Sequence, residues 1–316
     1  MKTPPSIRKH GNRVLMWRPV RKLIWASKRL VLPGFDGMPL YDVTLFFFNG
    51  LAKGYINARA SAISFSFVLA VFPFLIFLFT IIPFVPINNF QAVLLDVIQG
   101  FLPATAWDSV KGTIVDVITR PRSGLLLLNF ILTLYFSTNG VNSLIEAFNN
   151  TAHTIESRTV VKQYLISIVL VMIISLLLIL SIGIMTFGKG LLEVIFPDAV
   201  TASYIYLATM GVLRWLIVVA LLLVAISFLY FLAPAKRGRY RFISAGSMLA
   251  TILMIITTLG FNYYVDNFAR YNALYGSIGT LLIVLVWIYL NSISLLIGFE
   301  LNASIMNARQ AEEEGR

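Results

Sequence analysis

Glu300 is the residue whose setting points most clearly to chemistry, because it ends a long uncharged apolar run. A carboxylate in or near hydrocarbon must be paired, hydrated or protonated. Arg59 and Arg241 border two other apolar runs, and we expect both at the depth of Glu300. We predict that Glu300 pairs with one of them. We favour Arg59, because the small residues Ser61 and Ser64 would let helices approach closely. The alternative is a solvated carboxylate at a helix end.

Other polar residues lie inside the apolar runs and are candidates for a cavity or a substrate path. Asn139 belongs to a polar cluster at 137–143, and Glu146 follows it. This cluster could form hydrogen bonds between helices or line a path for a substrate or ion, and the sequence leaves both open. Asn291 shares one helical face of the last run with Trp287, Ser294, Gly298 and Asn302.

Two further candidates concern the course of single helices. Pro73 lies in the middle of the first apolar run, where proline removes a backbone hydrogen bond and tends to kink a helix. We expect a packing kink there, with a gating hinge as the alternative. Arg214 precedes an uncharged run at 215–234. We place it at the membrane interface, where an arginine can extend toward water. An earlier helix start would instead bury it as a functional candidate.

Catalytic chemistry finds little support in this sequence. The chain has no cysteine, which excludes disulfides, thiolate metal sites and a cysteine nucleophile. Its two histidines, His10 and His153, lie outside the apolar runs. No zinc-protease, phosphate-loop or serine-hydrolase motif is present. We therefore expect no enzymatic activity, no cofactor and no metal site.

The elements that would position these residues are membrane helices. Apolar residues make up 58% of the chain and charged residues only 12%, whereas soluble proteins average about 25% charged residues. Six runs are long enough for the roughly 20 residues of a membrane-crossing helix: 60–84, 123–148, 164–187, 215–234, 242–265 and 276–306. The sequence thus predicts an all-α polytopic membrane protein with six transmembrane helices. Gly246 and Gly260 favour close packing of the fifth helix.

The domain organisation follows from the segments around these runs. Residues 1–59 mix basic and aromatic side chains, which predicts a cytoplasmic region that lies partly on the membrane surface. Residues 60–307 form the transmembrane domain. Within it, 87–122 alternates with helical periodicity, which predicts amphipathic periplasmic helices between the first and second spans. Residues 308–316 form an acidic cytoplasmic tail, and we expect its glutamates at 312–314 to be disordered.

The distribution of lysine and arginine predicts the orientation. Most of the 25 basic residues lie in the amino-terminal region, after the second and fourth runs, and at the carboxyl end. The positive-inside rule then places both termini in the cytoplasm, and the short loops fit a bacterial inner membrane. The net charge of +11 is therefore an orientation signal. We expect anionic lipid headgroups, and not nucleic acid, as the partner. The oligomeric state is left open.

Several motifs resemble those of the YihY/BrkB family of bacterial inner-membrane proteins, which was formerly labelled ribonuclease BN. They follow one another along the chain: Ala60-Ser61-Ala62-Ile63-Ser64-Phe65 with Pro73, Phe101-Leu102-Pro103, Tyr230-Phe231-Leu232-Ala233-Pro234, Tyr275-Gly276-Ser277, Trp287-Ile288-Tyr289 and Gly298-Phe299-Glu300-Leu301. Ala70 departs from the family, which usually has serine there. The resemblance runs from about 53 to 307. It implies a six-helix membrane protein of poorly defined activity, suspected of transport.

Three classes of function fit these observations to different degrees. The first is a transporter or flippase for a lipid-like or amphiphilic substrate, which the polar residues in the spans, Pro73 and the basic inner flanks support. The second is a scaffold that organises envelope partners without transport, although the short loops argue mildly against it. The third is an enzyme, including a nuclease, for which no acid–base or metal constellation can be assembled.

Overall fold

The structure of the protein is a computed structural model. It describes residues 25–31, 34–84, 120–150, 158–195, 204–235, 242–268 and 277–314, with scattered residues between 91 and 116. The main elements of these stretches are α3 (Leu40–Lys53), α4 (Ile56–Ile81), the short η1 (Ile82–Phe84), α7 (Ser123–Asn149), α8 (Val160–Ile195), α9 (Tyr204–Leu232), α10 (Ala245–Phe268) and α12 (Ser277–Glu314). The amphipathic helices predicted for 87–122 fall largely outside the described residues.

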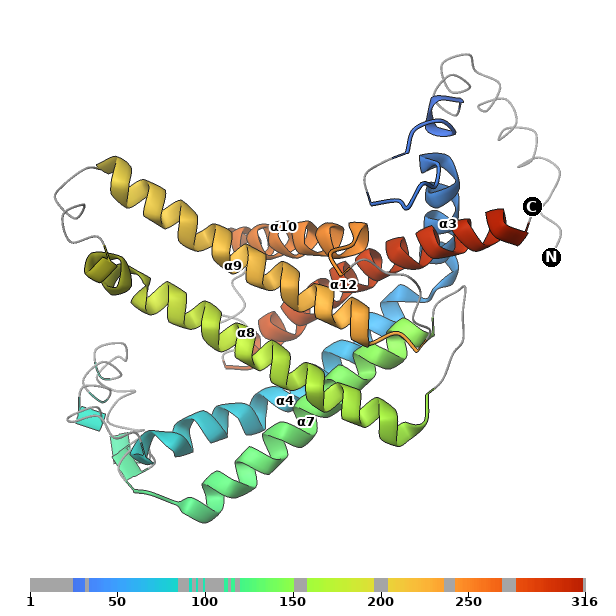
Figure 1. The fold of residues 1–316 in the computed structure, drawn as a ribbon. Helices are drawn as coiled ribbons and strands as arrows, with labels where there is room; N and C mark the ends of the chain where they lie inside the picture. The colour runs from blue at the N-terminus through green and yellow to red at the C-terminus, as the bar shows by residue number, and fades with distance from the viewer. Residues whose placement is uncertain are drawn as a thin grey trace.

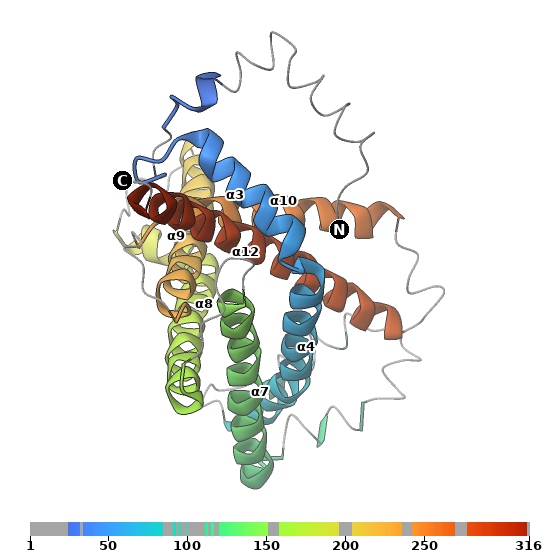
Figure 2. The same ribbon diagram turned by 90° about the vertical axis from the view of Figure 1, so that its right-hand side faces the viewer.

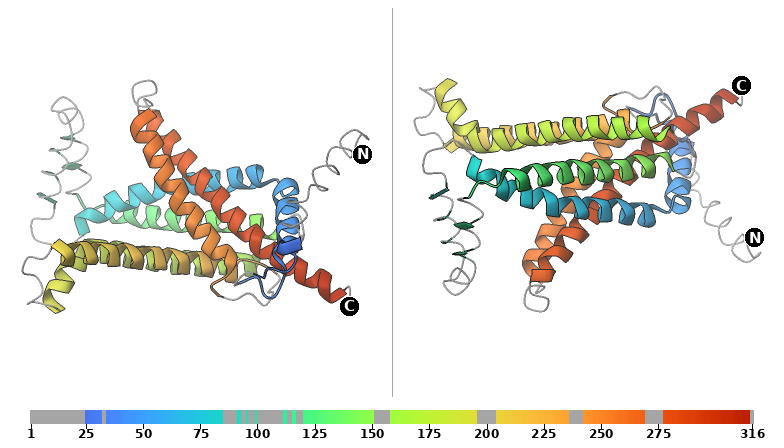
Figure 3. Two further views of the ribbon diagram at one scale, coloured as in Figure 1. Left: turned by 90° about the horizontal axis from the view of Figure 1, so that it is seen from above. Right: turned by 90° about the horizontal axis from the view of Figure 1, so that it is seen from below.

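Six of these helices are long and apolar enough to cross a membrane: α4, α7, α8, α9, α10 and α12. This confirms the predicted fold class. In Figure 1 the chain passes back and forth through them, and α4 lies beside α7, α8 beside α9, and α10 beside α12. Figure 2 shows α3 in front of α12, on which it packs. Figure 3 shows α4, α7, α8 and α9 running in a similar direction, whereas α10 and α12 cross them obliquely.

The buried core lies at one end of this bundle, which we call the packed end. All six spanning helices contribute to it, through a set that includes Ala60, Ile63, Leu144, Ile145, Phe148, Leu170, Ile226, Tyr230, Ala250, Leu296 and Phe299. At the opposite ends of the same helices, which we call the far end, large apolar side chains are exposed. Examples are Phe79 of α4, Leu127 of α7 and Ile179 of α8.

The start of α10 differs from the start of the predicted apolar run, because a capping residue sets it. α10 begins at Ala245 because Ser244 caps it. The Ser247 N–H donates to the Ser244 hydroxyl at 3.1 Å, and the Ser244 N–H donates to the Ser247 hydroxyl at 3.0 Å. Such reciprocal bonds satisfy backbone donors that the first turn of a helix leaves unpaired. The fifth span therefore starts three residues later than its apolar run.

The expectation that residues 312–314 are disordered is wrong, because α12 continues to Glu314. Ala308 is buried in a small core that α3 also joins. Arg309 pairs with Glu313 at 3.1 Å, one helical turn further on. Alanine, arginine, glutamine and glutamate are strong helix formers, and a pair at this spacing adds to helix stability. The tail thus extends the last span as a helix.

The basic amino-terminal region contains a helix that the sequence analysis did not predict. α3 buries Val43 and, together with Phe35 of the preceding turn, packs against Ile305 and Ala308 of α12. α3 therefore belongs to the folded domain, because its buried side chains pack on α12.

Candidate functional site

Arg59 lies near the start of α4 and reaches the ends of two other helices. Its Nη1 donates to the Gly54 carbonyl oxygen at the end of α3, at 3.1 Å, and its Nη2 donates to the Ala147 carbonyl oxygen in the last turn of α7. Carbonyl groups at a helix C-terminus lack intrahelical partners and carry the negative end of the helix dipole. The Arg59 guanidinium satisfies these acceptors and offsets their partial charge, and its side chain is only 10% exposed.

Glu300 lies at the same place. Its side chain is 0% exposed, and its Oε2 is 4.0 Å from Arg59 Nη1. This separation exceeds the roughly 3 Å of a hydrogen bond, so the contact is mainly Coulombic. Such attraction is much stronger in a protein interior than in water. The arginine beside Glu300 is the one that the sequence analysis favoured, whereas Arg241 falls outside the described residues.

Two glycines of the α3 end make this approach possible, and the sequence analysis missed them. A Cβ atom on Gly50 would lie 2.7 Å from the Glu300 Cδ and 2.9 Å from its Cγ. A Cβ atom on Gly54 would lie 2.6 Å from the Gly50 carbonyl oxygen and 3.3 Å from Arg59 Nη1. The signal in the sequence was a pair of small residues one helical turn apart, which is typical of close helix contacts.

The two serines that were expected to permit this approach form hydrogen bonds within their own helix. Ser64 is buried and donates to the Ala60 carbonyl oxygen at 2.6 Å, within its own helix. Ser61 is exposed and donates to the Asn57 carbonyl oxygen. The close contact at Glu300 includes Gly50 of α3, and the two serines satisfy their hydroxyls within α4.

Aromatic side chains from three helices pack beside the ion pair. Phe148 of α7 stacks on Phe299 of α12, with ring centroids 4.4 Å apart. Tyr230 of α9 meets each of these rings edge-on, with centroids 5.6 Å apart, and its hydroxyl donates to the Leu295 carbonyl oxygen at 2.6 Å. Stacked and edge-on pairs are favourable aromatic geometries. The cluster holds α7, α9 and α12 together next to Glu300.

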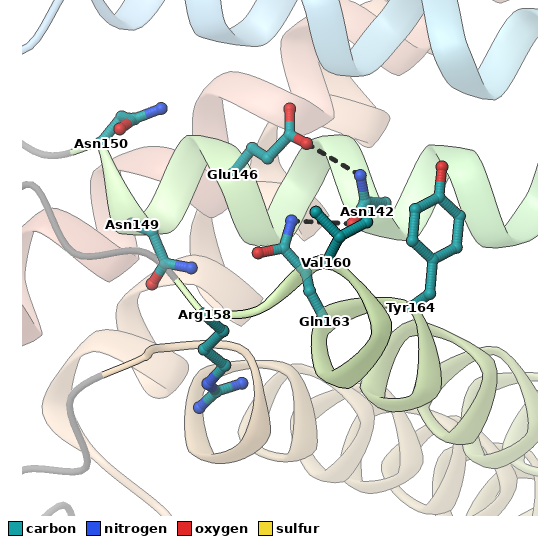
Figure 4. A pocket seen from close by; sticks show the side chains of 8 residues that line it. All are labelled: Asn142, Glu146, Asn149, Asn150, Arg158, Val160, Gln163 and Tyr164. Carbon is teal, nitrogen blue, oxygen red and sulfur yellow. Dashed lines mark hydrogen bonds between the residues drawn. The ribbon is translucent and has the colours of Figure 1, made fainter.

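A polar pocket of about 430 Å³ lies between the end of α7 and the start of α8. Figure 4 shows its lining: Asn142, Glu146, Asn149, Asn150, Arg158, Val160, Gln163 and Tyr164. A chain of hydrogen bonds follows one wall. Gln163 Nε2 donates to Asn142 Oδ1 at 2.8 Å, and Asn142 Nδ2 donates to Glu146 Oε1 at 2.9 Å. The pocket offers one carboxylate and several amides to a ligand.

Arg158 fastens this pocket to α9. Its guanidinium donates to the carbonyl oxygens of residues 232–234, at the end of α9. In Figure 4 its side chain points away from Glu146. Arg158 thus satisfies helix-end carbonyls as Arg59 does, on another helix of the packed end.

The polar face predicted on the last span forms the contact between α10 and α12. Asn291 accepts a hydrogen bond from Thr258 at 3.4 Å, and Trp287 Nε1 donates to the same hydroxyl at 3.3 Å. Asn302 Oδ1 accepts from the Gly246 N–H at 2.9 Å. These side chains therefore join two helices, whereas Asn291 was predicted as a candidate for a cavity or a substrate path.

The remaining predicted residues lie apart from one another. Asn139 accepts a hydrogen bond from the Tyr164 hydroxyl at 3.0 Å, between α7 and α8. Pro73 is buried, and α4 continues through it. Arg214 is half-buried within α9, about 27 Å before the end of that helix at 1.5 Å per residue. Among the site residues predicted from the sequence, Glu146 is the one that lines the pocket between α7 and α8.

These observations define two polar centres at the packed end. One is the Arg59–Glu300 pair, enclosed by α3, α4, α7 and α12. The other is the pocket, which is open to a ligand. In the described part of the chain, no group of three histidine, cysteine, aspartate or glutamate side chains is placed to hold a metal ion.

Comparisons with known proteins cover most of the chain. A family model described as "Virulence factor BrkB" matches residues 47–316. The ribonuclease-like protein YfkH of Bacillus subtilis is 30% identical over 258 residues, which are 82% of this chain and 93% of that protein. A UPF0761 membrane protein of Chromohalobacter salexigens is 28% identical over 80% of this chain and 60% of its own length. One of Haemophilus influenzae is 24% identical over 84% and 96%. No solved structure matches the chain.

Proposed function

We propose, from the premise that this chain belongs to the BrkB family of integral membrane proteins, that it is a transporter or flippase for a lipid-like or amphiphilic substrate. The observation that carries this proposal is the pocket of about 430 Å³ between α7 and α8. Its amide and carboxylate groups would hold a polar headgroup. Val160 on its rim and the adjacent Val161 are each 72% exposed and would contact an apolar tail. A largely preformed site with a few placed polar groups suits such a ligand.

The charges of the pocket favour a headgroup that carries hydrogen-bond donors. Arg158 directs its guanidinium to the carbonyl oxygens of residues 232–234. Glu146 accepts from Asn142 through one oxygen, and a carboxylate has about four acceptor positions. Hydroxyl or ammonium groups of a substrate would fill the remaining positions.

Lipid movement by the purified protein in liposomes tests this proposal. The vesicles carry fluorescent phosphatidylglycerol or phosphatidylethanolamine. Lipid in the inner leaflet is protected from an impermeant quencher, so the additional loss of fluorescence measures its transfer to the outer leaflet. We expect transfer above protein-free vesicles, and a lower rate for Glu146→Gln. The control is Glu313→Gln, an exposed glutamate of the α12 tail, which should leave the rate unchanged. A folded protein that moves neither lipid would overturn the proposal and favour the scaffold.

We also propose an orientation in which the packed end faces the cytoplasm of a bacterial inner membrane. The distribution of lysine and arginine supports this orientation. A reporter fused after Arg316 should then be active in the cytoplasm. Activity of the fusion only in the periplasm would reverse the orientation.

Anionic lipid headgroups, and not nucleic acid, are the proposed partner of the basic amino-terminal region. Trp25 is 58% exposed, and the Arg29 guanidinium lies 3.8 Å from its ring centroid, a pairing that suits the headgroup level. A peptide of residues 8–32 should bind anionic vesicles and weaken with salt. Equal binding to neutral vesicles would contradict this.

We propose further that the chain is not an enzyme. The lack of nuclease motifs in the sequence supports this. RNA cleavage by the purified protein with Mg²⁺ or Mn²⁺ would contradict it.

A further inference from the structure

α3 differs from the six spanning helices in direction and in the distribution of its apolar side chains. Figure 3 shows it running across the packed end, while α4, α7, α8 and α9 run away from that end. It stops at Lys53, and α4 begins at Ile56. Gly54 and Tyr55 make the turn between them, and Tyr55 adopts the left-handed conformation with φ 47°. This sharp turn keeps α3 at the depth where the first span begins.

The two faces of α3 have different surroundings. Val43 and Gly50 are buried, in contact with the α12 side of the molecule. The opposite face exposes large apolar side chains, with Leu45 52% exposed and Phe48 62% exposed, and Tyr55 follows in the turn at 83%. The charged residues of α3, Asp42 and Lys53, lie near its two ends. The outward face between them therefore carries no charge.

We infer that the outward face of α3, formed by Leu45, Phe48 and the adjoining Tyr55, is seated in the headgroup region of the lipid leaflet at the packed end. Two arguments select lipid as the occupant. α3 is continuous with a spanning helix through a two-residue turn, so its outward face meets the same bilayer surface. Its uncharged apolar face resembles the lipid-facing side of helices that lie in the membrane plane, and its other face packs on α12 where such helices usually carry polar groups.

Charges at the start of α3 agree with this placement. The Lys28 ammonium lies 4.9 Å from the Tyr41 ring centroid, and the Leu40 N–H donates to the Leu30 carbonyl oxygen at 2.9 Å. The preceding basic turn is thus fastened to the beginning of α3. A cation beside an aromatic ring at the membrane boundary suits contact with anionic headgroups. The inference does not depend on transport, so it stands or falls separately from the proposed function.

Spin-label accessibility in proteoliposomes tests this inference, because the chain has no native cysteine. Nitroxide labels are attached to the single variants Leu45→Cys and Phe48→Cys. Leu176→Cys, 67% exposed in the middle of α8, provides the lipid reference, and Glu313→Cys on the α12 tail provides the water reference. The label on Val43→Cys reports whether α3 stays docked on α12. At this buried position the label should be shielded both from oxygen and from a water-soluble nickel chelate.

The expected result is that labels at positions 45 and 48 collide with oxygen more than with a water-soluble nickel chelate, by a ratio several-fold above that of Glu313→Cys. A ratio equal to that of Glu313→Cys would overturn the inference. So would spin–spin broadening that disappears on dilution with unlabelled protein, because a second copy of the chain would then cover this face. Gel filtration of each variant shows that the result comes from folded protein.

Discussion

The packed end and the far end of the same six helices are held by different interactions. At the packed end, Arg59 joins α3, α4, α7 and α12 through two carbonyl contacts and one ion pair. At the far end, side chains such as Phe79 and Leu127 are about half exposed or more. Because lipid tails are as apolar as leucine, apolar contacts between helices gain little in a membrane. Association of these helices therefore rests on polar groups and close approach.

The comparison also separates two carboxylates that look alike in the sequence. Glu300 is fully buried beside Arg59, and we expect it to act in holding the helices together. Glu146 borders the pocket, where it can meet a ligand. Substitutions should therefore act on stability at Glu300 and on substrate handling at Glu146.

Arg59→Ala should have the largest effect, because it leaves the helix-end carbonyls at Gly54 and Ala147 unsatisfied and the buried Glu300 without its arginine. Loss of one partner of a buried pair costs about 3–5 kcal/mol. Unfolding in mixed detergent micelles measures the loss. Arg309→Ala is the control, since this arginine is paired on an exposed helix surface, where a pair is worth roughly 0.2–1 kcal/mol. Equal losses would show that the packed end has no special role.

Glu300→Gln should destabilise the protein by about 1–3 kcal/mol, because a charged group loses its partner. The double-mutant cycle of Glu300→Gln with Arg59→Gln isolates the interaction between the two residues. We expect a coupling of about 0.5–3 kcal/mol. Additive losses would mean that the 4.0 Å contact between them contributes no direct energy.

Gly246→Ala should cost about 1–3 kcal/mol through overpacking, because an added Cβ would overlap the α12 backbone at Gly298. Gly260 provides a matched control on the same helix. The sequence predicted close packing at both glycines. A Cβ on Gly260, however, would meet nothing within 4 Å in the described chain. Gly260→Ala should be neutral or stabilising, by up to about 1 kcal/mol, through helix propensity. An equal loss of stability in Gly246→Ala and Gly260→Ala would contradict the prediction that only Gly246 is closely packed.

Ile179→Ala at the far end should have the smallest effect, within about 0.5 kcal/mol, because the side chain is 65% exposed and meets lipid in both folded and separated helices. Leu296→Ala at the packed end, where the side chain is 0% exposed, should cost more, about 1–3 kcal/mol, because the truncation leaves a cavity and removes van der Waals contacts between helices. Refolding in bicelles measures both. A large loss at Ile179 would show that the far end is also held by specific packing.

The helical face on the last span illustrates what spacing can predict. Asn291 and Asn302 recur at helical intervals, and the structure places both against α10. Spacing could not say which neighbour they meet, because that depends on how helices pair in space. For the same reason, Asn139, Asn291 and Glu300 do not converge: each contacts a different helix.

Six spans and the isolation of Glu300 in an apolar helix could be predicted from the amino-acid sequence alone. Both follow from local composition, since about 20 apolar residues must form a helix in a bilayer. Three contacts could not be predicted in this way: Gly50 admits the Glu300 carboxylate, Arg59 caps α7, and Asn142 and Gln163 form the wall of a pocket. These contacts join residues far apart in the chain. Their geometry depends on helix crossing and rotation, which composition and periodicity do not specify.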